Sequence, residues 1–334
     1  MDTKELSRVA SHMVMPNKGI LAADESTGTI KNRFDSINVE STEENRRNWR
    51  QLLFQTQSIS DYISGVILFD ETLKQRSSEG EKFVDLLNKK NILPGIKVDK
   101  STHPLPLSDG EVITEGLDGL RERLEEYLKI GAKFTKWRAV INISDKFPSN
   151  YAINVNSYHL ALYSALSQEI GLVPIVEPEV LMDGNHSIEK CAEVTTKTLK
   201  KVFNDLNDSN VYLQGIVLKP NMVLSGKDAS NRGDAKQVAK YTVDVLKETV
   251  PKEVPGIAFL SGGQEDQESI DNLNEINIYA KQNKSPWELT YSYGRGLQGA
   301  PLKIWRGNSE NVVNAQNEFE KRGISASKAR QGEY

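Results

Sequence analysis

The stretch Gly215-Ile216-Val217-Leu218-Lys219-Pro220-Asn221 is an apolar run of strand type that ends in a lysine. Pro220 stops the run, because proline has no N–H to donate to a neighbouring strand. A lone lysine at a strand end most often extends its ammonium group to water. The alternative is that Lys219 ends in a pocket, where apolar walls and nearby cations favour the neutral, nucleophilic amine.

Apolar runs of the same kind recur along the chain, spaced by about one βα unit. The eight runs are Gly19–Asp24, Ser64–Phe69, Leu93–Val98, Phe134–Val140, Val173–Glu177, Gly215–Lys219, Gly256–Ser261 and Leu289–Tyr293. Strands that are apolar throughout predict a parallel sheet covered on both faces. Alternation of these strands with helices predicts an α/β fold, a (β/α)8 TIM barrel. A doubly wound open sheet is the alternative, but no Gly-x-Gly-x-x-Gly follows the first run.

Helical patterns fill most of the gaps between the runs. Their apolar stripes lie within Leu117–Leu128, Ile153–Leu166, Ile188–Leu206 and Val238–Leu246. Ser41–Glu44 has the pattern of a capping box and predicts a helix through about Gln55. Residues 3–14 predict an extra N-terminal helix, and Asn308–Lys321 an extra C-terminal one.

We expect one domain over residues 1–334, because no linker or low-complexity tract interrupts the alternation. The last residues, 323–334, are small and polar and predict a tail that packs loosely on the surface or frays.

Composition narrows the class of protein. With 42 Lys and Arg against 46 Asp and Glu, the net charge is -4, which argues against general binding to nucleic acid or to a membrane surface. Cys191 is the single cysteine, so no internal disulfide is possible, and its place in a helical stripe indicates core packing. The N-terminus lacks an apolar signal region, and we expect a cytoplasmic protein.

Charged residues stand at the carboxyl ends of the runs, where a barrel holds its chemistry. They are Asp24, Lys97, Asp99, Lys136, Arg138, Glu177, Glu179, Lys219 and Arg295, accompanied by Ser261–Gly263 and Gly294. Each one alone is most simply a solvated residue. Lys136 and Arg138 share one face of their strand and could form a structural ion network with Glu177 and Glu179. All of them converge on one mouth, however, which is costly unless they hold one another and a ligand.

This set of side chains suggests lysine chemistry. An amine such as Lys219 condenses with a carbonyl to a Schiff base, an electron sink that permits cleavage of a neighbouring carbon–carbon bond. Carboxylates nearby supply the proton transfers. Glycine-rich turns with Arg295 predict a phosphate cradle, and Arg33, expected in the first βα loop, could clamp a second phosphate. No cofactor signature appears. The four histidines have no spacing typical of a zinc site, so we expect no metal.

At these residues the sequence resembles the class I fructose-1,6-bisphosphate aldolases, the Schiff-base-forming family of glycolysis. The resemblance covers nearly the whole chain, and its motifs are specific in combination. The matching stretches are Gly19–Gly28, Glu43–Arg47, Gly65–Phe69, Gly95–Lys100, Lys136–Arg138, Pro174–Glu179, Leu218–Met222, Phe259–Gln264 and Ser292–Arg295.

The resemblance implies a role for each catalytic candidate. Lys219 matches the Schiff-base lysine, and Glu177 matches the acid/base that dehydrates the carbinolamine. Asp24 matches the carboxylate that takes the proton from the hydroxyl on carbon 4. Lys136 matches the cation beside the Schiff-base lysine, and Glu179 a supporting carboxylate.

The resemblance also implies a sugar bisphosphate as substrate, a TIM barrel and a homotetramer. The residues that match the phosphate on carbon 1 are Ser261, Gly262, Gly294 and Arg295. Those that match the other phosphate are Ser26, Arg33 and Lys97, and Thr29 and Arg138 are further substrate-binding candidates. Thr29 stands where many members have serine but keeps a hydroxyl.

The C-terminus departs from the animal-type pattern, in which a further tail ends in a tyrosine that assists protonation of the enamine. Here the sequence ends at Gln331–Tyr334, and Tyr334 matches the residue before that tail. Either another group protonates the enamine, or Tyr334 itself is recruited.

Two other functions remain open at the level of sequence. The barrel could prefer fructose 1-phosphate or sedoheptulose 1,7-bisphosphate. It could also be a non-catalytic protein that binds a sugar phosphate or a filament. Against the second, the set of Lys219, Glu177, Asp24 and Lys136 is intact, and a binding protein needs no amine nucleophile.

Overall fold

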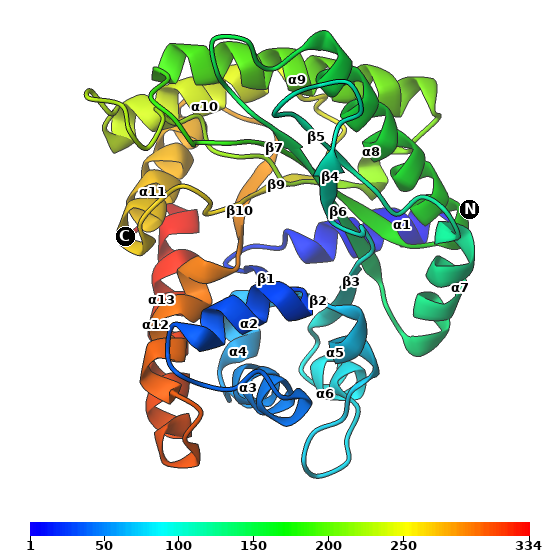
Figure 1. The fold of residues 1–334 in the computed structure, drawn as a ribbon, viewed down its shortest axis with the longest axis vertical. Coiled ribbons are helices and arrows are strands. Elements are labelled where there is room, and N and C mark those ends of the chain that lie inside the picture. The colour runs from blue at the N-terminus through cyan, green and yellow to red at the C-terminus, as the bar shows by residue number, and fades with distance from the viewer.

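The computed structural model describes all 334 residues and confirms the barrel (Figure 1). Eight parallel strands close on themselves in the order β1-β10-β9-β8-β7-β6-β3-β2. The strands are β1 (Gly19–Ala23), β2 (Ile63–Leu68), β3 (Leu93–Lys97), β6 (Phe134–Ile141), β7 (Val173–Val180), β8 (Val217–Leu218), β9 (Gly256–Phe259) and β10 (Glu288–Tyr293). Every residue of β1, β2 and β7 is buried, as expected for a sheet covered on both faces.

Helices surround the barrel between successive strands. They are α2 (Thr27–Asp35), α3 (Glu43–Gln55), α4 (Ile59–Tyr62), α5 (Asp70–Lys74), α6 (Phe83–Lys89), α7 (Leu120–Ile130), α8 (Asn150–Ile170), α9 (Ile188–Asp208), α10 (Ala235–Thr249), α11 (Asp266–Gln282) and α12 (Arg295–Trp305), with 3-10 turns η1 (Leu213–Gly215) and η2 (Ser309–Asn311). The predicted cap of α3 is displaced by one residue, because Thr42 accepts the hydrogen bond from the backbone N–H of Asn45.

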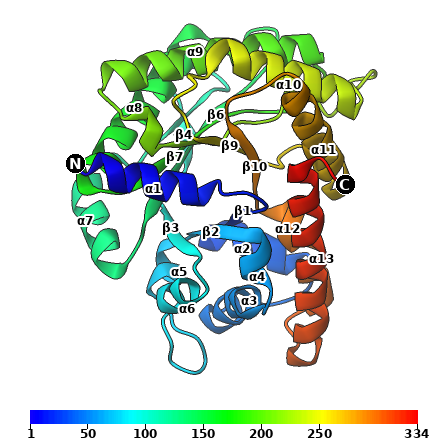
Figure 2. The same ribbon diagram turned by 180° about the vertical axis from the view of Figure 1, so that it is seen from behind.

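The N-terminal helix α1 (Thr3–Met13) closes the amino end of the barrel. Its buried side chains, Leu6 and Met13 among them, pack in one cluster with strand residues that include Ile20, Ile175 and Val217. Figure 2 shows α1 lying across the strands on this side of the molecule. Because this end is plugged, the carboxyl ends of the strands form the open mouth.

A short antiparallel hairpin, which the sequence analysis did not predict, follows β3. Its strands are β4 (Thr102–Pro104) and β5 (Val112–Thr114). The hairpin stands outside the barrel sheet. Thr114 at its end donates its hydroxyl to the backbone oxygen of Arg138 in β6, 2.6 Å away, which fixes the hairpin at the mouth.

The C-terminal segment corrects the sequence prediction. Helix α13 (Val312–Gln331) continues through most of the residues expected to form a loose tail. Its last turn is fixed by Arg330, which is buried. The guanidinium of Arg330 donates to the backbone oxygens of Val14, Met15 and Lys18 and to the carboxylate of Glu288. This end of α13 is thus part of the amino face of the barrel.

None of the helices has the length and apolar character needed to cross a bilayer.

Candidate active site

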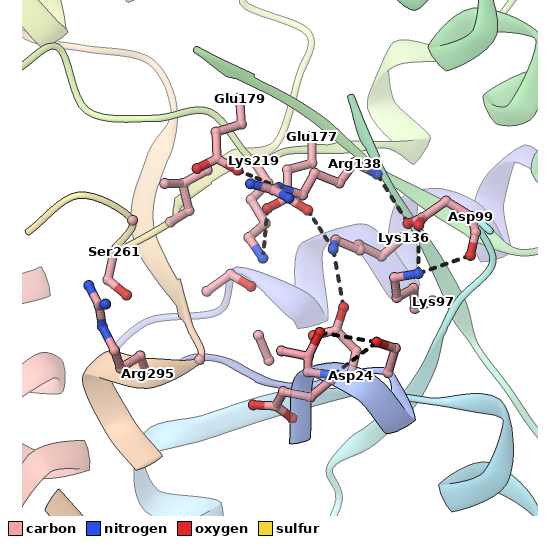
Figure 3. Close-up of a pocket in the computed structure, with 18 of the residues that line it drawn as sticks. Asp24, Lys97, Asp99, Lys136, Arg138, Glu177, Glu179, Lys219, Ser261 and Arg295 are labelled. Atoms are coloured by element: carbon pink, nitrogen blue, oxygen red, sulfur yellow. Dashed lines mark hydrogen bonds and ion pairs between the residues drawn. The ribbon is translucent and has the colours of Figure 1, made fainter. Parts of the chain in front are cut away.

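The mouth of the barrel holds a cavity of about 700 Å³. All of the predicted catalytic and substrate-binding residues line it: Asp24, Ser26, Thr29, Arg33, Lys97, Lys136, Arg138, Glu177, Glu179, Lys219, Ser261, Gly262, Gly294 and Arg295. Figure 3 shows side chains from different strands meeting in this space. The convergence that sequence analysis inferred from strand ends is therefore a property of the fold.

Lys219 follows the last residue of β8, and its side chain is 4% exposed. The interpretation that this lysine extends to water is therefore wrong. The expectation of apolar walls is also wrong, because Ala22 and Leu260 are the hydrophobic residues among the cavity's lining. The cavity around Lys219 is lined instead mostly by charged and hydroxyl side chains.

Glu177, in β7, lies between two lysines. Its Oε1 atom is 3.2 Å from Nζ of Lys219, and its Oε2 atom is 2.9 Å from Nζ of Lys136. The Nζ atom of Lys136, in β6, also donates to Oδ2 of Asp24 at 3.1 Å. Lysines and carboxylates therefore alternate from β8 through β7 and β6 to the end of β1.

The electrostatic environment within this row of ion pairs determines the charge states of Asp24 and Lys136. Burial disfavours the ionised form of Asp24, but the ammonium groups of Lys136, Lys219 and Lys97 outweigh burial and hold the pKa of Asp24 well below its usual value. Burial likewise disfavours the charged form of Lys136, but Asp24, Glu177 and Asp99 outweigh it and raise the pKa of Lys136. Asp24 is thus ionised, and able to accept a proton, over the physiological range.

A second ion pair joins strands β6 and β7, which the Lys136–Glu177 pair already connects. Arg138 of β6 donates through Nε to Oε2 of Glu179 of β7. The structural ion network that the sequence suggested therefore exists: Lys136 and Arg138 of β6 pair with Glu177 and Glu179 of β7. Glu179 is buried, whereas the side chain of Arg138 is 40% exposed, so the pair presents a cation to the cavity.

One wall of the cavity carries the groups expected at the end of the substrate remote from carbon 1. Nζ of Lys97 is 2.5 Å from Oδ1 of Asp99. The hydroxyls of Ser26 and Thr29 lie 3.0 Å apart in a cap at the start of α2, where Ser26 Oγ also accepts from the backbone N–H of Thr29. A helix N-terminus with two hydroxyls and a nearby lysine favours an anion.

The opposite wall carries the glycine-rich turns. Figure 3 shows Ser261 and Arg295 across the cavity from Lys97 and Asp99. Gly294 is the N-cap of α12 and supplies no side-chain acceptor to the first turn of that helix. The N-terminus of α12, with the Ser261 hydroxyl and the Arg295 guanidinium, forms an anion cradle.

Arg33 lies in α2 rather than in a loop, and it faces this cradle. A Cβ atom on Gly294 would lie 3.9 Å from Nη2 of Arg33 and 3.3 Å from the backbone oxygen of Ala22. Sequence analysis assigned Arg33 to the phosphate remote from carbon 1 and Gly294 to the phosphate on carbon 1. In the structure the two residues are neighbours.

Several cavity residues escaped the sequence analysis. Glu25 stands beside the predicted Asp24, and Ser292 and Lys227 also line the cavity. Ser292 is buried in β10 with its hydroxyl unpaired. Its place at the start of the matching stretch Ser292–Arg295 was an available signal, whereas nothing local marked Lys227 as a residue of the mouth.

Cys191 is buried in α9, as predicted, and burial raises the pKa of its thiol to about 11. No group of three or more His, Cys, Asp or Glu side chains is arranged to hold a metal ion.

Comparison with known proteins decides the family. The family model for the class I fructose-bisphosphate aldolases of glycolysis matches residues 5–334. The chain belongs to the class I fructose-bisphosphate aldolases. It is 52% identical over 332 residues to the cytosolic fructose-bisphosphate aldolase 4 of Arabidopsis thaliana, covering 99% of this chain and 84% of that protein. It is 51% identical over 333 residues to fructose-bisphosphate aldolase 1 of Toxoplasma gondii, covering 99% of this chain and 91% of that protein.

A solved structure of a fructose-bisphosphate aldolase has the same fold as this chain. The fructose-bisphosphate aldolase of Plasmodium falciparum, crystallised with TRAP and a small-molecule inhibitor, matches with a TM-score of 0.97 at 48% identity. The match covers 99% of this chain and 95% of that one. The resemblance inferred from motifs and the fold inferred from periodicity are both confirmed.

Proposed function

We propose that this chain cleaves fructose 1,6-bisphosphate reversibly to dihydroxyacetone phosphate and glyceraldehyde 3-phosphate through a Schiff base on Lys219. The observation that carries the proposal is the buried contact of Lys219 Nζ with Glu177 Oε1 at 3.2 Å, inside a cavity with an anion site on each side. The contact joins an amine nucleophile to the proton carrier that its chemistry requires.

The first stage forms the imine. Glu177 takes one proton from the ammonium of Lys219, 3.2 Å away. The neutral amine attacks carbon 2 of the open-chain sugar, and a proton moves from its nitrogen to the carbonyl oxygen to give a carbinolamine. Glu177, in its protonated form, gives its proton to the departing hydroxyl, and water leaves as the protonated imine forms. Its distance from the two lysines lets Glu177 pass protons to either side.

The second stage breaks the carbon–carbon bond. Asp24 accepts the proton of the hydroxyl on carbon 4, the bond between carbons 3 and 4 breaks, and its electron pair moves into the protonated imine to give an enamine. The low pKa of Asp24 keeps the carboxylate ionised before it takes this proton. Lys136, 3.1 Å from Asp24, holds the carboxylate in place.

Two separated anion sites favour a bisphosphate. The cradle of Ser261, Gly294 and Arg295 suits the phosphate on carbon 1, and the wall of Ser26 and Lys97 suits the phosphate on carbon 6. Fructose 1-phosphate would leave the second wall empty, so we expect the lower kcat/KM for it.

Borohydride trapping tests this function. Incubation with fructose 1,6-bisphosphate and borohydride, followed by peptide mass analysis, should place a substrate-derived adduct on Lys219. Lys219→Ala should fold but form no adduct there and cleave no substrate, whereas Lys240→Ala, on the exposed face of α10, should behave like the parent. Cleavage that is sensitive to EDTA and leaves no lysine adduct would refute the mechanism, and binding without any cleavage would favour a sugar-phosphate-binding protein.

The family also suggests how the protein assembles and where it acts. We propose a cytoplasmic homotetramer. Exposed aromatic side chains on α8, Tyr151 at 47% and Tyr158 at 56%, offer a surface for association. Sedimentation equilibrium would give the mass of the assembly, and a mass of one chain would contradict the tetramer.

A further inference from the structure

Glu25 is the centre of a buried ionic cluster next to the catalytic groups. Its side chain is 4% exposed. Its Oε1 atom accepts from Nη1 of Arg33, and its Oε2 atom accepts from Nη2 of Arg50 in α3 at 2.5 Å. A buried carboxylate that accepts hydrogen bonds from two guanidinium groups is held in one orientation.

A glutamine completes the cluster. Gln298 of α12 donates through Nε2 to Oε1 of Glu25 at 3.0 Å and to the backbone oxygen of Ala22 at 2.7 Å. Its Oε1 atom accepts from Arg50 at 3.1 Å and from Trp49 at 3.2 Å. The cluster therefore ties together the end of β1, helix α3 and the helix whose N-terminus forms the anion cradle.

Arg33 is the member of the cluster that exposes a cationic group to the cavity. Arg50 is 3% exposed, whereas the side chain of Arg33 is 28% exposed and its Nη2 atom lies beside Gly294. Arg33 and Arg50 share one carboxylate, so the three charges sum to one positive charge. The exposed face of Arg33 is where an anion can neutralise that charge.

We propose that Glu25 is a positioning residue for phosphate recognition, which fixes the guanidinium of Arg33 against the anion cradle of Gly294 and Arg295. Glu25 acts through Arg33 and is itself held by Arg50 and Gln298. The inference rests on the proposed function, since the phosphate it serves belongs to the sugar phosphate substrate.

This role can be separated from a simple effect of charge. Glu25→Gln removes a negative charge near the cavity. If Glu25 acted on the substrate only through its charge, the variant would bind phosphate more tightly. If Glu25 positions Arg33, the variant binds phosphate more weakly although the cavity becomes more positive, because Arg33 is no longer fixed.

The experiment measures KM and kcat for fructose 1,6-bisphosphate, and Ki for inorganic phosphate, in the complete protein. Glu25→Gln should raise KM and Ki about tenfold, as expected for loss of one charge-assisted contact, while kcat changes by less than about threefold. Glu71→Gln is the matched control, because both carboxylate oxygens of Glu71 also accept from a guanidinium, that of Arg46, outside this cavity. It should leave KM and Ki unchanged.

A double-mutant cycle assigns the effect to Arg33. In an Arg33→Met background, adding Glu25→Gln should change KM no further. Arg50→Lys, which loosens one hold on Glu25, should raise KM to a smaller extent and serves if Glu25→Gln does not fold. Unchanged or lower KM and Ki in these variants, or an equal further rise in the Arg33→Met background, would overturn the proposal. Absence of cleavage and of a Lys219 adduct in the parent protein would instead overturn the proposed function.

Discussion

The Nζ atom of Lys136 lies 3.1 Å from Oδ2 of Asp24, and both side chains are nearly sealed from water, at 6% and 12% exposure. The same ammonium is 2.9 Å from Glu177. One cation thus neutralises part of the charge of two carboxylates that have different tasks in the proposed mechanism. Without it, two buried carboxylates would face each other across the mouth of the barrel.

Lys136→Met should therefore damage both stability and catalysis. It removes the shared cation and leaves Asp24 and Glu177 with a poorly compensated negative charge. We expect a loss of about 3–5 kcal/mol in the free energy of unfolding. We also expect kcat to fall at least about a hundredfold, because proton transfers by both carboxylates are disturbed. Urea denaturation and steady-state kinetics on the same preparation measure the two effects.

The control for that substitution is Lys240→Met. Lys240 also pairs with a carboxylate, that of Asp244, but its side chain is 60% exposed. We expect a change of less than about 0.5 kcal/mol and unchanged kcat. If Lys136→Met were as mild as this control, the shared-cation interpretation would fail.

The Asp24–Lys136 pair also predicts how stability depends on pH. The pKa of Asp24 in the folded chain lies below its ordinary value of 3.8, so its contribution to stability is complete above that value and is lost as the pH falls toward the folded pKa. The free energy of unfolding, measured by urea at about pH 6 and about pH 3, should drop less in Asp24→Asn than in the parent. Equal drops in the two proteins would show that Asp24 makes no such contribution.

The turn after β9 gives a steric prediction. A Cβ atom on Gly262 would lie 2.9 Å from Oε1 of Glu179, closer than carbon and oxygen approach without a shift. Gly262→Ala should displace Glu179 and, with it, Arg138, which we expect to raise KM several-fold with little change in thermal stability. Gly28→Ala is the control, since a Cβ there meets nothing within 4 Å. The same KM in both variants would mean that the turn tolerates a side chain.

Much of this architecture could be predicted because it depends on local periodicity. The apolar runs located all the barrel strands, and a parallel barrel brings every carboxyl end to one mouth. Lys219, Glu177 and Asp24 could be placed in one cavity for that reason alone. Helix α1 could be predicted from its stripe, but its position across the amino end depends on long-range packing.

The errors arose where partners are distant in sequence. The strands β4 and β5 have three residues each, and β4 is exposed, so the hairpin is too short to show an apolar pattern. Residues 323–331 read as a tail because they are small and polar. They are helical because small residues such as Gly323, Ala326 and Ala329 are buried against the body, and no partner for them is visible in the local sequence.

Arg330 provides the test of this last point. Its buried guanidinium donates to the backbone oxygens of Val14, Met15 and Lys18. The oxygens of Met15 and Lys18 also accept from the backbone N–H of Lys18 and the hydroxyl of Thr290, so the loss falls mainly on the oxygen of Val14 and on the pair with Glu288. Arg330→Met should lower the free energy of unfolding by about 2–4 kcal/mol and leave kcat unchanged, because the contacts lie at the closed end of the barrel. Lys328→Met, two residues earlier on an exposed face, should have little effect on either. Equal stability of the two variants, by urea denaturation, would mean that the end of α13 is as loose as its composition suggests, whereas the expected difference would show that one buried arginine fixes this helix to the amino face.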